Sequence, residues 1–168
     1  MLYILGGLPA VGKSELAKHL ASSVGAVYLR IDSIEQELRN SGFKNLYDEG
    51  YKIAFALALE NLKNGVCVVA DSTNPVAESR SAWINVAKQA QSQFVEIQII
   101  CSSKQEHRER VENRKTDIRN LSLPDWESVV SRNYQHWASP KIVLDTAGKS
   151  PEQSKLELME LLSSGIDT

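Results

Sequence analysis

The sequence reads Gly7-Leu8-Pro9-Ala10-Val11-Gly12-Lys13-Ser14 immediately after an apolar run at residues 2–5. This stretch matches the pattern G-x-x-x-x-G-K-[ST], and a helix-period sequence at residues 15–20 continues from it. A loop of this composition turns its backbone N–H groups toward an anion at the N-terminus of the following helix. A chance match in a chain of this length occurs about once in a hundred sequences. The stretch therefore predicts a strand, a phosphate-binding loop and a helix, in that order.

The loop predicts a binding site for a nucleoside triphosphate. In such loops the lysine, here Lys13, reaches the β- and γ-phosphates, and the hydroxyl after it, here Ser14, binds Mg²⁺. A glycine-rich turn with an ordinary exposed lysine is the alternative, and the strand-loop-helix context favours the nucleotide. The motif alone does not say what the triphosphate is used for. Nucleotide contacts are expected from Gly7, Leu8, Pro9, Ala10, Val11, Gly12, Lys13, Ser14 and Glu15.

The composition is typical of one soluble domain. The chain has 168 residues, 42% hydrophobic and 24% charged, so we expect a single domain over residues 1–168. A net charge of -2 argues against a protein that coats nucleic acid or a membrane surface. The first residues carry no basic signal segment, and no apolar run approaches the ~20 residues of a membrane span. Cys67 and Cys101 lie in apolar runs, which is typical of reduced cytoplasmic thiols, and the histidine spacing predicts no zinc site.

Apolar runs alternate with helix-period segments along the whole chain, which predicts an α/β fold around a parallel sheet. The expected strands lie at residues 2–5, 26–31, 66–70, 94–100 and 141–144. The expected helices lie at residues 13–24, 33–40, 48–64, 76–91, 103–115, 125–137 and 151–163. Residues 41–48 and 116–124 are irregular, and loops beyond the carboxyl ends of strands carry function in such folds. These two segments are therefore candidates for a substrate-binding loop and a lid.

Asp71 follows the apolar run at residues 66–70. A carboxylate in this position beside a phosphate loop holds Mg²⁺ directly or through water, so Ser14 and Asp71 are the expected metal site. A turn-forming aspartate would give the same pattern. Asn74 and Pro75 come next, and they fit the N-cap and the first turn of the following helix.

Asp32 closes the expected strand at residues 26–31 and therefore lies on the same edge of a parallel sheet as the phosphate loop. Its carboxylate is a candidate general base, which would accept a proton from an attacking hydroxyl. The alternative is a capping box with Glu35, in which the Asp32 carboxylate binds helix amides. One residue can fill both roles.

Residues 103–115 predict a helix that is polar almost all round and is not expected to pack into the core. Arg110 and Arg114 lie four residues apart on one face, where their repulsion would turn into attraction for a bound polyphosphate. A solvated helix face is the alternative. We expect the lid region to span residues 103–137 approximately. Tyr47, beyond Asp32, is a candidate for stacking on an acceptor, or else for core packing.

These residues together resemble the small P-loop kinases related to 5′-hydroxyl polynucleotide kinases, zeta toxins and chloramphenicol phosphotransferase. The resemblance covers most of the chain, and the phosphate loop is its only highly specific motif. It rests on residues 7–9 and 12–14, Asp32, residues 71–75, Arg80, Arg110, Arg114, Asp145 and Thr146. It implies a three-layer P-loop NTPase fold of the nucleoside and adenylate kinase type, with a five-stranded parallel sheet in the order 2-3-1-4-5.

The resemblance also implies roles for individual residues. Asp32 would activate an acceptor hydroxyl, Arg110 and Arg114 would bind the ATP phosphates, and Thr146 would lie near the base. Contacts to the acceptor are expected from Asp32, Tyr47, Asn74 and Arg80. Two departures weaken the match: Ala10 and Val11 replace a glycine and a small polar residue, and Glu35 replaces the arginine that binds the acceptor's phosphate in phage-type polynucleotide kinases.

The sequence therefore predicts an ATP- and Mg²⁺-dependent phosphotransferase whose acceptor is a hydroxyl of a small molecule. A kinase acting on the 5′-hydroxyl of RNA or DNA is an alternative, which Glu35 and the acidic net charge disfavour. A nucleotide-binding switch without an acceptor is another, and in it Asp32 would serve only as a helix cap.

Overall fold

A computed structural model describes residues 1–138 and 142–165, and it contains a five-stranded sheet in the order β2-β3-β1-β4-β5. The paired strands are all parallel. The strands are β1 (Leu2–Gly6), β2 (Val27–Arg30), β3 (Val68–Asp71), β4 (Phe94–Ile100) and β5 (Ile142–Asp145). The α/β fold class and the strand order implied by the resemblance are confirmed. Lys141, the expected first residue of the last strand, lies outside the described residues.

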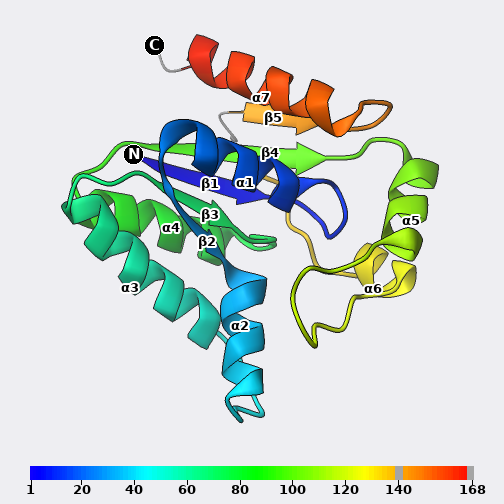
Figure 1. Ribbon diagram of the computed structural model, residues 1–168, viewed down its shortest axis with the longest axis horizontal. Helices are drawn as coiled ribbons and strands as arrows, with labels where there is room; N and C mark the ends of the chain where they lie inside the picture. Colours follow the sequence, from blue (N-terminus) through cyan, green and yellow to red (C-terminus); the bar gives the residue numbers. More distant parts are fainter. Residues whose placement is uncertain (139–141, 166–168) are drawn as a thin grey trace.

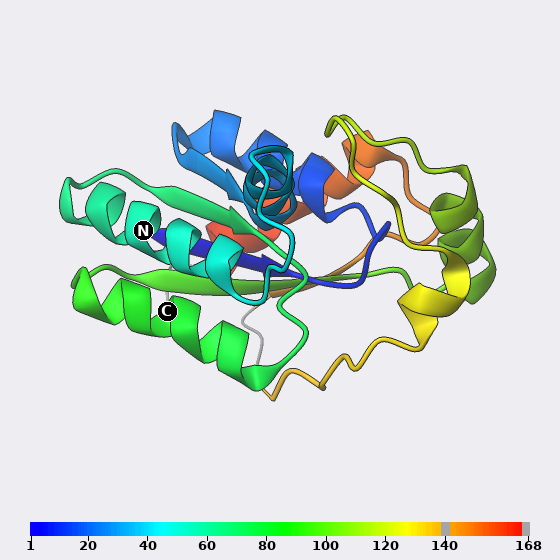
Figure 2. The same cartoon turned by 90° about the horizontal axis from the view of Figure 1, so that it is seen from below.

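Helices cover both faces of the sheet (Figure 1). They are α1 (Lys13–Val24), α2 (Ile31–Asn40), α3 (Glu49–Lys63), α4 (Ala77–Gln89), α5 (Lys104–Asn113), α6 (Trp126–Val130) and α7 (Pro151–Gly165). Helices α1 and α7 lie on one face, and α3 and α4 lie on the other, as the view from below also shows (Figure 2). Helices α5 and α6 lie beyond the carboxyl edge of the sheet, whereas α2 follows β2 and extends away from the sheet beside α3. No described helix is both long enough and apolar enough to cross a membrane.

The core has two halves because successive side chains of a strand point to opposite faces. On β1, Tyr3 and Leu5 pack toward α1 and α7, whereas Leu2 and Ile4 pack toward α3 and α4. All five residues of β1 are buried, which explains the nearly continuous apolar run in the sequence. This burial holds the phosphate loop, which begins at the end of β1, against a rigid support.

The helix expected at residues 125–137 is wrong beyond α6, which ends at Val130. The chain continues in an irregular path because side chains bind its backbone in place of helical hydrogen bonds. The Arg80 guanidinium donates to the carbonyl oxygens of Gln135 and His136. Trp137 is buried, and its ring lies directly against Gly6. Trp137, the last residue of the expected helix, is therefore packed on a strand.

We predict that Gly6→Ala destabilises the fold through this contact. An added Cβ would lie 2.2 Å from the Cζ2 atom of Trp137, so the ring must move. Overpacking of this kind costs about 1–3 kcal/mol of unfolding free energy, which denaturant titration measures. The Gly6→Ala/Trp137→Leu double variant should lose less than the sum of the single variants. Additive losses would contradict the contact.

Candidate functional site

A cavity of about 1160 Å³ opens at the carboxyl edge of the sheet, between the phosphate loop, α2 and the segment after α5. Ligand sites of open parallel sheets lie at this edge. Several residues that the sequence predicted for the site line the cavity together. They are Pro9, Ala10, Gly12, Lys13, Ser14, Glu15, Asp32, Arg110, Arg114 and Thr146.

The phosphate loop has the backbone of an anion-binding turn. Gly12 immediately precedes α1 with a φ of 97°, and Ala10 has a φ of 66°. The left-handed conformation at Ala10 costs a non-glycine residue about 1–2 kcal/mol. The substitution that the sequence flagged as a departure is therefore accommodated at a cost in strain.

Lys13 is buried across the mouth of this loop, and its Nζ atom donates to the carbonyl oxygen of Leu8 at 3.2 Å. Burial lowers the pKa of the Lys13 ammonium, while the nearby Asp71 and Asp32 carboxylates oppose this shift. Both acidic residues predicted for the site therefore act electrostatically on the loop lysine. Their fields keep a charged amine available where the phosphates of a nucleotide would lie.

Asp71 lies at the end of β3 and is only 3% exposed. Its Oδ2 atom accepts a hydrogen bond from the Tyr28 hydroxyl at 2.7 Å, and the Nε atom of Arg30 lies 3.8 Å from the same oxygen. Burial and the Asp71 charge raise the pKa of Tyr28 well above its ordinary value, so the phenol stays protonated and donates. The Asp71 carboxylate is thus held in one orientation at the end of β3, although Asp71 is not among the residues that line the cavity.

The residues present fit a magnesium ion that is bound chiefly through a substrate. Within residues 1–138 and 142–165, no group of three acidic, histidine or cysteine side chains could hold a metal by itself. Magnesium, however, is usually bound by one or two protein oxygens together with phosphates and water. Ser14 supplies a hydroxyl and Asp71 a carboxylate, which is the donor chemistry that Mg²⁺ requires.

Asp32 is the second residue of α2, and the helix-capping interpretation is wrong for it. The helix begins at Ile31, two residues earlier than expected, so Arg30 occupies the N-cap position and no side chain caps the helix. In the described part of the chain, the exposed Asp32 carboxylate has no hydrogen-bond partner, although it lines the cavity. It is therefore available to a ligand.

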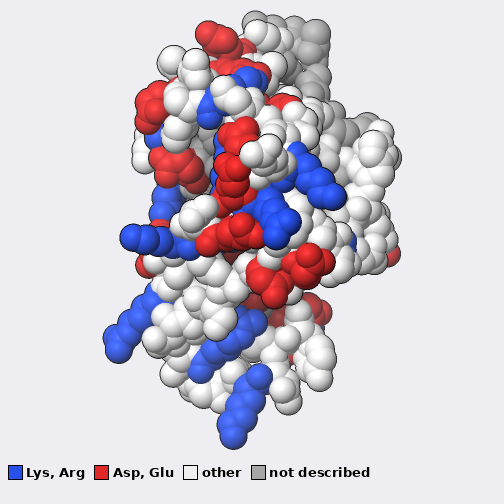
Figure 3. Space-filling view, turned by 90° about the vertical axis from the view of Figure 1, so that its right-hand side faces the viewer, with Lys and Arg blue, Asp and Glu red and all other residues white. Residues whose placement is uncertain are grey.

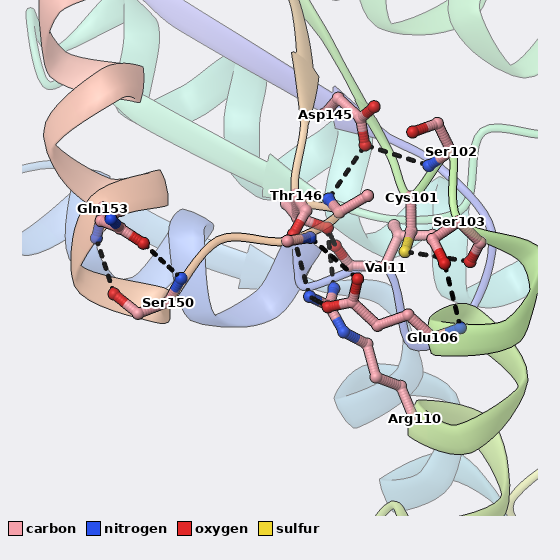
Figure 4. A network of polar contacts seen from close by, with 12 residues as sticks. Val11, Cys101, Ser102, Ser103, Glu106, Arg110, Asp145, Thr146, Ser150 and Gln153 are labelled. Atoms are coloured by element: carbon pink, nitrogen blue, oxygen red, sulfur yellow. Dashed lines mark hydrogen bonds and ion pairs between the residues drawn. The ribbon is translucent and has the colours of Figure 1, made fainter.

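The two lid arginines differ in their surroundings. Arg110 donates through Nη1 to Thr146 Oγ1 at 2.8 Å and through Nη2 to the Thr146 carbonyl at 2.9 Å, and it pairs with Glu106 (Figure 4). Arg114 is half-buried and has no hydrogen-bond partner among the described residues. Burial lowers the pKa of Arg114, and the Asp32 carboxylate opposes the shift. Of the two arginines on this helix face, Arg114 is therefore the one without a hydrogen-bond partner among the described residues, and it is available to an anion.

Helix α5 is anchored to the phosphate loop, contrary to the expectation that it would not pack. His107 and Val111 are buried on one face of α5. The His107 Nε2 atom lies 2.8 Å from the carbonyl oxygen of Pro9, and its ring meets Trp126 edge to face. Two buried residues one turn apart thus replace the wide apolar stripe of a typical core helix.

The segment that follows α5, part of the expected lid, lines the cavity and is held there by a residue that the sequence did not indicate. Asp117 accepts hydrogen bonds from Lys18 on α1 and, at 2.8 Å, from Nη1 of Arg30 on β2. The bonds from Lys18 and Arg30 hold the pKa of Asp117 well below its usual range. The sequence indicated Arg30 only weakly as a site residue, because it ends a strand at this edge two residues before Asp32. Nothing in the sequence indicated Asp117.

Three residues predicted for the acceptor lie elsewhere. Tyr47 is 85% exposed and is not part of the cavity wall. Asn74 is buried with a φ of 47°, and its Nδ2 atom donates to the Leu5 carbonyl at 2.8 Å. It does not cap α4, because Val76 occupies that position. Arg80 is buried and binds four backbone carbonyls, including that of Asn74, so both side chains serve the fold behind the loop.

The parallel sheet order, the strand-loop-helix at β1 and the strand-end carboxylate on β3 define an α/β P-loop NTPase fold. The AAA_33 family, described as an AAA domain, matches residues 2–131. The chain therefore belongs to the AAA_33 family.

Solved structures share the fold over nearly the whole chain. A candidate kinase from Chloroflexus aurantiacus has a TM-score of 0.72 and 20% identity, covering 98% of this chain and 96% of its own. A sugar kinase from Janibacter sp. has a TM-score of 0.68 and 14% identity, covering 96% and 94%. Kti12 from Chaetomium thermophilum, in complex with ADP-AlF3, has a TM-score of 0.62 and 19% identity, covering 99% of both chains.

We predict that Asp117→Asn loosens the lid. The variant loses the charge that binds Lys18 and Arg30, and exposed ion pairs contribute about 0.5–1 kcal/mol in total. Trypsin should then cleave after Lys115 or Arg119 about two- to fivefold faster, because cleavage follows the open population. Asp48→Asn, which removes an exposed pair with Lys52 outside the cavity, is the control and should leave this rate unchanged. Equal cleavage rates in the wild-type protein and both variants would contradict the role of Asp117 in holding the segment after α5.

Proposed function

We propose that the protein transfers the γ-phosphoryl group of Mg-ATP to a hydroxyl of a small molecule. The observation that carries the proposal is the shared cavity. In it, the Asp32 carboxylate and the Arg114 guanidinium, which have no hydrogen-bond partner among the described residues, lie in one lining with the phosphate loop and Lys13. A nucleotide-binding module alone has no need of an unpartnered carboxylate opposite the phosphates. Phosphoryl transfer to an alcohol requires one, as the proton acceptor.

The residues divide the chemistry between them. Lys13 and Arg114 bind the phosphate oxygens and stabilise negative charge that spreads over the transferring group. Asp32 accepts the hydroxyl proton while the new O–P bond forms and the bond from the γ-phosphorus to the ADP oxygen breaks. Ser14 and Asp71 would hold Mg²⁺, which would supply further charge neutralisation at the phosphates. Arg110, bound to Thr146, fixes α5 beside the nucleotide site and does not itself bind the phosphates in this arrangement.

A small acceptor is supported by the electrostatics of the open face. Seen from the carboxyl edge, basic and acidic side chains are interspersed and do not form a continuous basic track (Figure 3). Glu35 lines the acceptor end of the cavity and pairs with Arg39 at 3.3 Å. A nucleic-acid backbone would meet this carboxylate, and binding of nucleic acid depends on positive charge. The sugar kinase fold relative acts on a class of small molecules rich in hydroxyls, and the Kti12 complex holds a nucleotide.

The acceptor can be found by incubating the protein with γ-labelled ATP, Mg²⁺ and a panel of hydroxylated metabolites and 5′-hydroxyl oligonucleotides. We expect label on a metabolite. Label on oligonucleotides alone would replace the small acceptor with a nucleic acid end. Nucleotide binding without transfer to any compound would favour a nucleotide-dependent switch.

With that acceptor, we predict that Asp32→Asn lowers turnover about 100- to 10,000-fold, the usual contribution of a general base. Calorimetry should show a much smaller change in Mg-ATP affinity than in turnover, because in the described part of the chain Asp32 makes no hydrogen bond to the loop and acts on Lys13 only through its charge. Lys13→Ala should lose both transfer and tight nucleotide binding. Glu37→Gln is the control, since Glu37 is exposed on the same helix outside the cavity wall. Full activity in Asp32→Asn would refute the base assignment.

A further inference from the structure

The Tyr28 hydroxyl binds one of the two side chains that we assign to the metal. Tyr28 is on β2 and packs in the half of the core that α1 covers. Its hydroxyl reaches the Asp71 carboxylate at 2.7 Å. One hydroxyl on the neighbouring strand thus holds the strand-end carboxylate.

The direction of this hydrogen bond is fixed by chemistry. An ionised carboxylate only accepts, so the Tyr28 hydroxyl donates its proton to Asp71. The Asp71 Oδ2 atom is occupied by Tyr28, and the other carboxylate oxygen remains for the metal or its water.

We infer that Tyr28 is a positioning residue for magnesium: it orients the Asp71 carboxylate so that its other oxygen meets the ion. This inference rests on the proposed function, because it concerns the metal that accompanies the nucleotide. Partners of metal ligands that fix the ligand orientation commonly change metal affinity by about 10- to 100-fold when they are removed. Arg30 contributes charge beside the same carboxylate, but its Nε atom, at 3.8 Å, is too far to fix the carboxylate's orientation by a hydrogen bond.

A purely structural role for Tyr28 makes a different prediction, and the fold offers a matched control. Val69 pairs with Tyr28 on one side and with Tyr3 on the other, so the two tyrosines lie in one row across the sheet. Both pack in the same half of the core. Tyr3 is buried and makes no hydrogen bond to Asp71 in the described part of the chain. Tyr28→Phe and Tyr3→Phe therefore each remove a phenol hydroxyl from similar surroundings. Only the Tyr28 hydroxyl binds the carboxylate that we assign to the metal.

The test is the binding of AMPPNP by calorimetry over a range of Mg²⁺ concentrations, with thermal melting as a check on folding. For Tyr28→Phe we expect about a tenfold rise in the Mg²⁺ concentration needed for half-maximal binding, with unchanged AMPPNP affinity in EDTA. Tyr3→Phe should match the wild-type protein in both measurements. An unchanged Mg²⁺ requirement in Tyr28→Phe, or an equal rise in both variants, overturns the inference and leaves the proposed function intact.

A second comparison guards against an indirect effect of lower stability. In an Asp71→Asn background, Tyr28→Phe should raise the Mg²⁺ requirement no further, because the carboxylate that it orients is already lost. Independent, additive effects would overturn the inference. Failure of the wild-type protein to bind AMPPNP, or binding that ignores Mg²⁺, would instead overturn the proposed function.

Discussion

The site depends on the hydrogen-bonded register of three neighbouring strands. Leu5 pairs with Asp71, and Asp71 pairs with Arg30, so the ends of β1, β3 and β2 form one row. The phosphate loop leaves this row from β1, the candidate metal carboxylate ends β3, and the candidate base follows β2. A one-residue slip would turn each of these side chains to the opposite face. The packing of the two halves of the core opposes such a slip, because it would exchange the side chains that fill them.

Charge in the site is arranged so that cations outnumber their protein partners. Lys13 has only a backbone carbonyl, Arg114 has no hydrogen-bond partner in the described chain, and Arg30 shares its carboxylates with Tyr28 and Lys18. Buried charge without a counter-ion is costly. A polyphosphate would remove this cost. The groups that lower the stability of the fold therefore favour the binding of an anion in the cavity. The Asp117 carboxylate, which pairs with Lys18 and Arg30, supplies part of the negative charge that these cations require.

Local pattern predicted the framework, and side-chain packing decided the rest. The loop was predictable because its motif, strand and helix are contiguous, and the strand order came from the resemblance. The length of α6 was overestimated because Trp137 fits the helical spacing. Its ring packs instead on Gly6, a contact between residues far apart in the sequence. Arg80 and Asn74 looked like acceptor contacts, yet they satisfy backbone groups that only the folded chain brings near. Asp117 lies in an irregular loop, where no periodicity indicates what a side chain will meet.

The bond between His107 and the Pro9 carbonyl has a consequence for how molecules enter the cavity. It joins the base of α5 to the phosphate loop, and Arg110 joins the middle of the same helix to the turn after β5. Helix α5 is therefore tied to the sheet at two points. Under the proposed function, exchange of product for fresh nucleotide would need only a local rearrangement of the stretch between Arg114 and α6, without rotation of a whole subdomain.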